Sequence, residues 1–212
     1  MIIQCDFDGT ITEEDVSFIL LDAFAQGDWR KLFQQYREHK MTVGEFNARA
    51  FAMVKVGREK LLGVARGRVK LRAGLHELVA YCRSRGFRFV IVSNGLDFYI
   101  ESILKDAGLG DIEVYAAQTR FRPSGLKVQY IGPDDTPLSS DFKAAYTIAF
   151  LKQGYRVVYV GNGPSDMSPA AQAHYVFARN GLLDCCRETN LKCNPFDDLN
   201  DIVKGLESLQ GA

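Results

Sequence analysis

Two aspartates near the start of the chain are the residues best suited to chemistry. Asp6 and Asp8 follow directly after the largely apolar residues 1–5. Such a run predicts a buried strand that ends where the acids begin, at the edge where open α/β sheets bind ligands. Residues two positions apart in extended chain face the same side, and two close carboxylates repel unless a cation lies between them. The pair therefore indicates a site for Mg²⁺, which prefers oxygen ligands.

The two residues after the acids fit the same hypothesis. Gly9 allows backbone amides to approach an anion closely, and the Thr10 hydroxyl adds a hydrogen-bond donor. The alternative interpretation of this stretch is an acidic surface turn after an edge strand.

Polar residues also follow the later strand-like runs. A lysine in the first turn of a helix opposes the helix dipole, so its presence suggests a nearby anion. Because parallel strands end at one edge of a sheet, we expect these groups to converge on the two aspartates. The residues are Ser93, Asn94, Lys143, Asn162 and Asp166.

Together these groups predict a cage for phosphate. The charge of a phosphoryl group would be neutralised by a metal ion and a lysine, and by hydrogen bonds from a hydroxyl and from backbone amides that a glycine leaves accessible. One aspartate could then act as a nucleophile, and the second could pass a proton to the leaving oxygen. The expected chemistry is phosphoryl transfer, in which positioning and electrostatics supply most of the acceleration.

The pattern of strands and helices predicts the fold class. It is an α/β, Rossmann-like three-layer sandwich with a parallel sheet. Expected strands cover residues 1–5, 88–92, 112–116, 156–160 and 175–178, with further β character at 118–130. Expected helices cover residues 74–85, 98–107, 140–153 and 168–173.

The segment between the first two strands holds more helix than one crossover needs. Helical patterns begin near residue 14 or 15 and continue over residues 29–39, 42–54 and 58–65. We therefore expect a small inserted helical cap at 13–70, and a Rossmann-like core made of 1–12 and 71–212.

Composition narrows the range of partners. Among the 212 residues, the charges of 26 basic and 26 acidic side chains cancel. The chain therefore has no net positive charge that would attract nucleic acid or an anionic membrane. No apolar run reaches the roughly 20 residues of a membrane span. The five cysteines have no regular spacing, as expected in a reducing compartment. We expect a cytoplasmic protein that binds a small phosphorylated metabolite; the sequence does not predict its oligomeric state.

Four ordered motifs resemble those of the haloacid dehalogenase superfamily. They are residues 6–10, Ser93, Lys143 and residues 161–166. The helical insertion after the first motif is similar to the phosphoserine phosphatase branch, and residues 5–12 look like those of the methionine-salvage enol-phosphate phosphatases. The resemblance implies a Mg²⁺-dependent phosphatase in which Asp6 forms an aspartyl-phosphate and Asp8 protonates the leaving group.

The resemblance also implies the remaining site. Asp6, the Asp8 carbonyl and two fourth-motif residues, Asn162 and Asp166, would bind the metal. Phosphate would be bound by residues of the first three motifs. These are Gly9, Thr10, Ser93, Asn94 and Lys143.

One position departs from the family pattern. Asn162 stands where the family usually has an acidic metal ligand, so Mg²⁺ binding should be weaker or should depend on Asp166. Alternatives are a phosphoserine phosphatase or phosphotransferase, or a catalytically impaired protein that only binds phosphate esters. Two residues are further candidates for contacting the substrate: Asp15, which could equally cap a helix, and Arg68, from a basic run that could simply be solvated.

Overall fold

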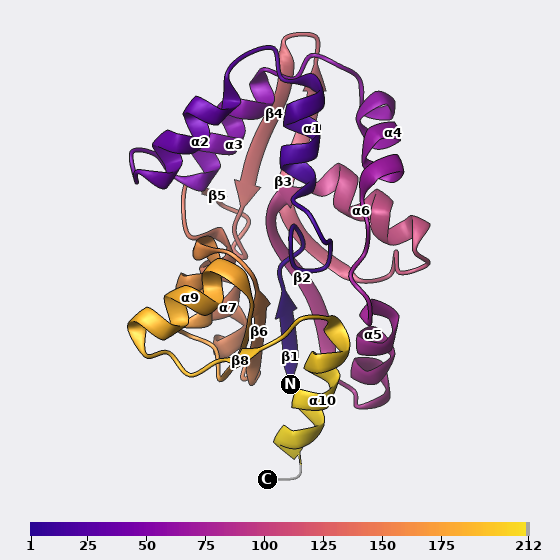
Figure 1. Ribbon diagram of the computed structural model, residues 1–212, viewed down its shortest axis with the longest axis vertical. Helices are drawn as coiled ribbons and strands as arrows, with labels where there is room; N and C mark the ends of the chain where they lie inside the picture. Colours follow the sequence, from indigo (N-terminus) through magenta and orange to yellow (C-terminus); the bar gives the residue numbers. More distant parts are fainter. Residues whose placement is uncertain (211–212) are drawn as a thin grey trace.

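The computed structural model describes residues 1–210, and its centre is one mixed eight-stranded sheet (Figure 1). The strand order is β5-β4-β3-β2-β1-β6-β7-β8. Strands β3, β2, β1, β6, β7 and β8 run parallel, whereas β4 and β5 are antiparallel to their neighbours. The strands are β1 (Ile2–Cys5), β2 (Arg88–Leu96), β3 (Glu113–Arg122), β4 (Gly125–Ile131), β5 (Pro137–Leu138), β6 (Val157–Gly161), β7 (Tyr175–Ala178) and β8 (Asn194–Pro195).

Helices cover both faces of the parallel strands, which explains why the central strands are largely apolar. All four residues of β1 are buried, because β1 pairs with β2 on one side and β6 on the other. One face carries α5 (Leu75–Ser84), α6 (Asp97–Asp106) and α10 (Leu199–Gln210). The other carries α7 (Phe142–Lys152), the short α8 (Met167–Ala170) and α9 (Asn180–Thr189). The expected α/β fold class is confirmed.

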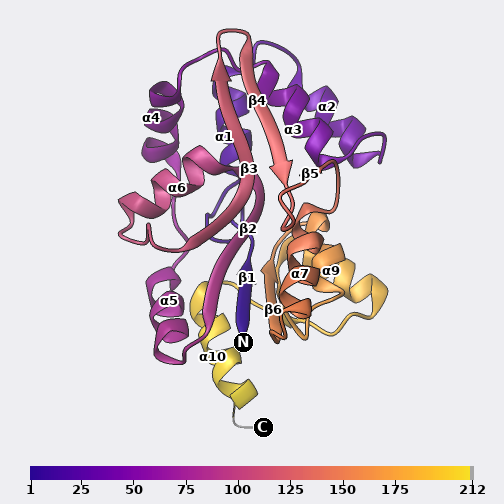
Figure 2. The same cartoon turned by 180° about the vertical axis from the view of Figure 1, so that it is seen from behind.

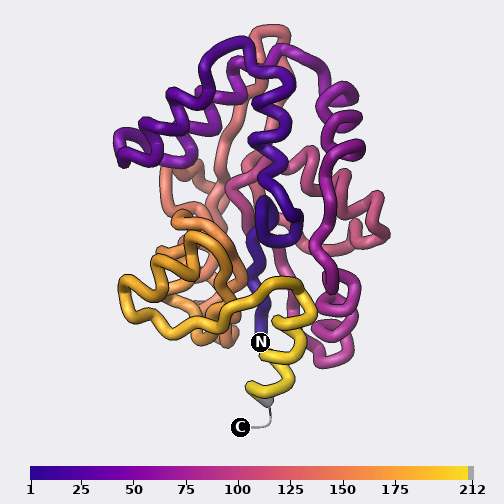
Figure 3. The backbone as a smooth tube through the Cα atoms, viewed as in Figure 1, coloured from indigo at the N-terminus to yellow at the C-terminus, as the bar shows by residue number. Residues whose placement is uncertain are grey.

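Four helices are inserted between β1 and α5. They are α1 (Val16–Phe24), α2 (Trp29–Arg37), α3 (Val43–Ala52) and α4 (Arg58–Arg68). The two connections to the rest of the chain lie side by side, since Thr12 bridges Leu71 and the Glu13 amide donates to the Lys70 carbonyl at 2.9 Å. The four helices therefore form a unit that leaves and re-enters the sheet at one point (Figure 3).

Strands β3 and β4 extend beyond the sheet as a hairpin that supports this unit. Helix α3 packs against β4, and α4 packs against α6 (Figures 1 and 2). The contact with the hairpin is close: a Cβ at Gly125 would collide with the Ala52 carbonyl, so only glycine fits there. The four helices are thereby held above the carboxyl end of β1.

The structure extends the predicted elements in two places. Strand β2 continues to Leu96 and β3 continues to Arg122, because β3 pairs with β2 first and with β4 afterwards. Residues 175–178, the last strand expected from the sequence, form β7 but are not the end of the sheet, because α9, β8 and α10 follow and β8 pairs with β7. Within residues 1–210, no helix is long and apolar enough to cross a membrane.

Candidate active site

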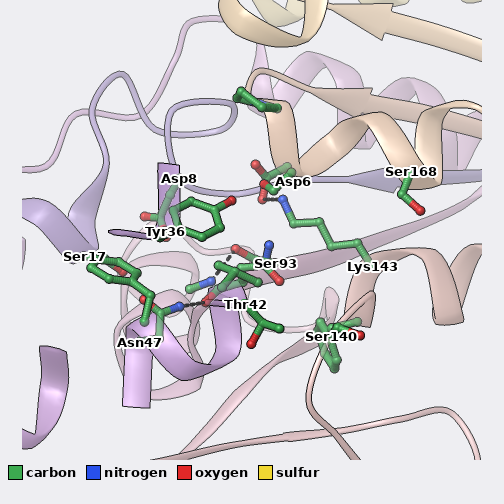
Figure 4. Close-up of a pocket in the computed structure, with 18 of the residues that line it drawn as sticks. Asp6, Asp8, Ser17, Tyr36, Thr42, Asn47, Ser93, Ser140, Lys143 and Ser168 are labelled. Atoms are coloured by element: carbon green, nitrogen blue, oxygen red, sulfur yellow. Dashed lines mark hydrogen bonds and ion pairs between the residues drawn. The ribbon is translucent and has the colours of Figure 1, made fainter. Parts of the chain in front are cut away.

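A pocket of about 890 Å³ lies between the carboxyl ends of the central strands and the inserted helices (Figure 4). Its floor comes from the loops after β1 and β6, from the end of β2 and from the first turn of α7. Seven of the predicted site residues line it: Asp6, Asp8, Asp15, Ser93, Asn94, Lys143 and Asn162. The predicted convergence of the strand ends therefore occurs.

The centre of the floor is a buried ion-pair network. Lys143 Nζ lies 2.8 Å from Asp6 Oδ1 and 2.6 Å from Asp166 Oδ1, and each of the three side chains is at least 94% buried. Burial lowers the pKa of Lys143, but Asp166 and Asp6 outweigh it, so the lysine stays charged. Burial, followed by the charge of Asp166, raises the pKa of Asp6 to about 7. One lysine thus balances two carboxylates, and the floor favours a further cation.

Asp166 uses both carboxylate oxygens within the protein. Oδ1 accepts from Lys143 Nζ and from the Tyr159 hydroxyl, each at 2.6 Å. Oδ2 accepts from the backbone amides of Asn162 and Gly163, each at 2.9 Å. Asp166 does not line the pocket. Its geometry is that of a residue that orients Lys143 and the loop after β6, and its predicted role as a metal ligand stays a prediction.

Asp8 is held away from Asp6 by a contact that the sequence did not indicate. Its Oδ2 accepts from the Tyr99 hydroxyl, which also bonds the Ser17 hydroxyl at 2.9 Å, and its Oδ1 accepts from the Val16 amide at 3.0 Å. Burial, with the charge of Asp15 next, raises the pKa of Asp8 well above its usual range. The hydrogen bonds from Tyr99 and from the Val16 amide act in the opposite direction, because they favour the carboxylate.

Gly95 makes this arrangement possible. A Cβ at this position would overlap the Tyr99 hydroxyl and Asp8 Oδ2, although the Gly95 backbone is not in the left-handed region. The glycine is therefore needed for space rather than for backbone freedom.

The backbone amides of the loop after Asp8 make hydrogen bonds within the loop itself. Gly9 has a φ of +73°, and its amide donates to Thr12 Oγ1, while the Thr10 amide donates to the Phe7 carbonyl. Neither Gly9 nor Thr10 lines the pocket. The turn itself uses the amides of these two residues, and their predicted phosphate contacts stay a prediction.

Two side chains fix this loop instead. The Arg72 guanidinium donates to the carbonyls of Gly9, Thr10 and Thr12 at 3.0, 2.7 and 3.1 Å. The Thr10 hydroxyl donates to Asn162 Oδ1 at 3.0 Å, which ties the loop to the end of β6. Arg72 belongs to the basic run at residues 66–72, but its role as a loop anchor was not predicted.

The end of β2 supplies a hydroxyl and an amide to the pocket. Ser93 is 1% exposed, and its Oγ accepts from the Gly95 amide at 3.0 Å. Beside it, the Asn94 carbonyl accepts from Asn47 Nδ2 at 2.9 Å and from the Tyr130 hydroxyl at 2.6 Å. Asn94 is therefore positioned both by the inserted helices and by the β3–β4 hairpin.

The opposite wall combines an aromatic surface with polar side chains. The inserted segment supplies Phe18, Phe33, Tyr36 and Phe46 from its helices and Met41 from the α2–α3 connection, and Arg37 and His39 line the pocket beside them. Asp15 lines the pocket and also caps α1, accepting from the Phe18 amide at 3.0 Å; burial raises its pKa to about 6. Arg68 is exposed on α4 and outside the pocket, so the structure does not place it near a substrate.

Few oxygen ligands remain for a metal ion. Within residues 1–210, no group of three or more His, Cys, Asp or Glu side chains is placed to hold one. Both carboxylate oxygens of Asp8 and of Asp166 already accept hydrogen bonds from the protein. Asp6 is therefore the carboxylate beside them that is best placed to bind a metal ion. A backbone carbonyl and the Asn162 amide oxygen add neutral donors, a mixture that Mg²⁺ accepts when water completes its shell.

The chain belongs to the haloacid dehalogenase-like hydrolase family, whose model matches residues 3–171. Two full-length relatives are the 2-hydroxy-3-keto-5-methylthiopentenyl-1-phosphate phosphatases of Brevibacillus brevis and Geobacillus kaustophilus. They are 28% and 29% identical to this chain; each match covers 99% of the chain and 96% or 97% of the relative. The predicted enzyme class, a phosphatase of this family, is confirmed.

Solved structures support the fold. A phospho-aspartyl intermediate analogue of phosphoserine phosphatase superposes with a TM-score of 0.73 at 19% identity, covering 96% of this chain and 97% of that one. A substrate-bound phosphoserine phosphatase complex superposes with a TM-score of 0.71, also at 19% identity and over 96% of each chain. At this identity the likeness concerns the fold alone.

Proposed function

We propose that the protein is a Mg²⁺-dependent phosphatase that hydrolyses a small phosphate monoester through an aspartyl-phosphate on Asp6. The observation that carries the proposal is the ion pair between Asp6 and Lys143 on the floor of a pocket that also holds Ser93. A buried carboxylate beside a fixed cation and a hydroxyl suits attack on phosphorus.

The reaction has two steps. An Asp6 oxygen attacks phosphorus, the ester oxygen leaves, and Asp8 gives the leaving oxygen its proton. Water then attacks the aspartyl-phosphate, Asp8 takes the proton back, and phosphate leaves. Lys143 and Ser93 hold the phosphoryl oxygens, while Tyr99 and the Val16 amide fix the orientation of the Asp8 carboxyl group.

Magnesium would be held by Asp6, the Asp8 carbonyl and the Asn162 amide oxygen. When bound, it neutralises charge on the phosphoryl group. Because Asn162 replaces an acid, we expect a higher Mg²⁺ requirement than a site with two carboxylate ligands would have. Asp166 instead keeps Lys143 oriented through its short contact with Nζ.

We further propose that residues 13–70 act as a cap and residues 1–12 and 71–212 as the catalytic core. The paired connections at Thr12 and Leu71 support this division. The cap supplies the wall that would contact the leaving group. All five cysteines are free, which favours a reducing compartment, and we place the enzyme in the cytoplasm.

The chemistry of the wall suggests the substrate class. An aromatic surface with Met41 suits an uncharged, partly apolar leaving group, and thioethers pack well against aromatic rings. The printed name of the Brevibacillus and Geobacillus substrate describes such a group, with a methylthio end. We propose a phosphate monoester of this kind. Phosphoserine is the second candidate, because Asp15 and Arg37 in the same lining could pair with its amine and its carboxylate.

A panel of phosphate esters tests this proposal. We expect kcat/KM for uncharged, partly apolar esters to exceed that for phosphoserine by about tenfold or more. Asp6→Asn should lower kcat at least about a thousandfold with every substrate, because an amide cannot act as the nucleophile. The exposed Asp184→Asn is the matched control and should be unchanged. An enzyme that binds these esters without turnover at any Mg²⁺ concentration would contradict the proposal.

A further inference from the structure

The side chain of Asn47 is oriented unambiguously by its neighbours. Its Nδ2 donates to the Asn94 carbonyl at 2.9 Å and to the Tyr130 hydroxyl at 2.6 Å. The Tyr130 hydroxyl in turn donates to the same Asn94 carbonyl. Because a backbone carbonyl can only accept, the nitrogen of Asn47 must face this group, and Oδ1 must face the other way.

The oxygen of Asn47 is left without a donor in the described part of the chain. Asn47 is 4% exposed and lines the pocket (Figure 4). Its Oδ1 receives no hydrogen bond from residues 1–210. The atom is not one of the fully buried polar atoms that lack a partner, so it stays accessible to solvent. The remaining accessible space around this residue is the pocket, so Oδ1 presents a fixed acceptor there.

The residues around Asn47 increase the contribution that its Oδ1 can make to substrate discrimination. Phe18, Tyr36 and Phe46 line the same pocket as Asn47 and offer a ligand apolar contact, and Arg37 and His39 line it as well. If a bound ligand displaces the water on this acceptor and offers no donor, the free energy of binding becomes less favourable. A site that hydrogen-bonds a substrate hydroxyl therefore discriminates strongly against an analogue without the hydroxyl.

We propose that Asn47 is a specificity-determining residue that accepts a hydrogen bond from a hydroxyl on the leaving group. The substrate class is then a phosphate monoester whose leaving group is uncharged and partly apolar and carries a hydroxyl near the cap wall. This inference rests on the proposed phosphatase function and adds the polar feature that the enzyme selects.

Matched pairs of substrates test the inference. Propyl and butyl phosphate are compared with the same esters carrying a hydroxyl at carbon 2 or 3, and each kcat/KM is measured. For the wild type, at least one hydroxylated ester should exceed its parent by about tenfold. In Asn47→Leu, which removes the acceptor at similar size, this ratio should fall to about twofold or less.

A control variant separates recognition from structural damage. Tyr130→Phe loosens the same anchor from outside the pocket, so it should lower kcat/KM for both members of a pair and keep their ratio. Asn47→Ser serves if Asn47→Leu does not fold, and it should also reduce the ratio. A ratio that survives both Asn47 variants overturns the inference.

The remaining outcomes are also decisive. Equal rates for hydroxylated and parent esters in the wild type overturn the inference while leaving the phosphatase function intact. A greater preference for the corresponding amino ester shows that the donor is an ammonium group, which overturns the hydroxyl assignment. Absence of Asp6-dependent turnover with any ester contradicts the proposed function instead.

Discussion

Asp166→Asn should destabilise the protein strongly even when no metal is present. Each Asp166 oxygen faces two donors: Lys143 Nζ and the Tyr159 hydroxyl on one side, and the amides of Asn162 and Gly163 on the other. Whichever way the asparagine amide turns, its NH₂ group points at two donors. The change also leaves Lys143 with one carboxylate instead of two.

The size of the effect follows from burial. Asp166 is 0% exposed and Lys143 is 3% exposed, so water cannot replace the lost contacts. Breaking a buried ion pair from one side costs about 3–5 kcal/mol. For a chain of this length, that loss corresponds to a fall in Tm of roughly 10 °C.

Urea unfolding in the presence of a chelator measures this loss without any contribution from a metal. Asp15→Asn is the matched control, since it changes a carboxylate to an amide in the same site and asparagine caps a helix as well as aspartate does. Because burial raises the pKa of Asp15 to about 6, this variant should keep or increase the free energy of unfolding at neutral pH, unlike Asp166→Asn. A loss below about 1 kcal/mol in Asp166→Asn would refute this reasoning and return Asp166 to the metal ligands.

Four further changes probe the other contacts of the site. Gly95→Ala should cost about 1–3 kcal/mol of stability and lower kcat, and adding Tyr99→Phe should recover part of the stability, which thermal melts of the single and double variants measure. Arg72→Lys should lower kcat about tenfold, because an ammonium cannot reach three loop carbonyls at once, as steady-state kinetics would reveal. Asn162→Asp should lower the Mg²⁺ concentration for half-maximal activity by about tenfold in a metal titration, since it adds a charged ligand. Arg68→Ala should leave kcat/KM within about twofold of the wild type, and a larger loss would place this exposed side chain near the substrate after all.

The sequence predicted the parts of the fold that depend on local pattern. The apolar run before Asp6 and the polar residues after the later strands marked the sheet edge, and the structure brings Ser93, Lys143 and Asn162 to it. The last helices were missed because the residues at 175–178 already supplied a plausible final strand, although Leu199, Ile202 and Leu206 carry a helical spacing.

Roles that depend on distant contacts were not accessible from the sequence. Tyr99 has the spacing of a core residue in α6, and its contact with Asp8 joins positions 91 residues apart. Arg72 resembles a solvated member of a basic run until its three carbonyl partners are seen. Asp166 has the spacing of a metal ligand, yet the fold surrounds it with four donors.

The central claim is that Asp6 carries the phosphoryl group during turnover. Acid quenching of the enzyme while it hydrolyses an ester, followed by peptide mass spectrometry, tests this claim directly. We expect a phosphoryl group on Asp6 in the wild type and none on this peptide in Asp6→Asn. A phosphoryl group on Ser93, or an enzyme that turns over without any phosphorylated peptide, would contradict the account.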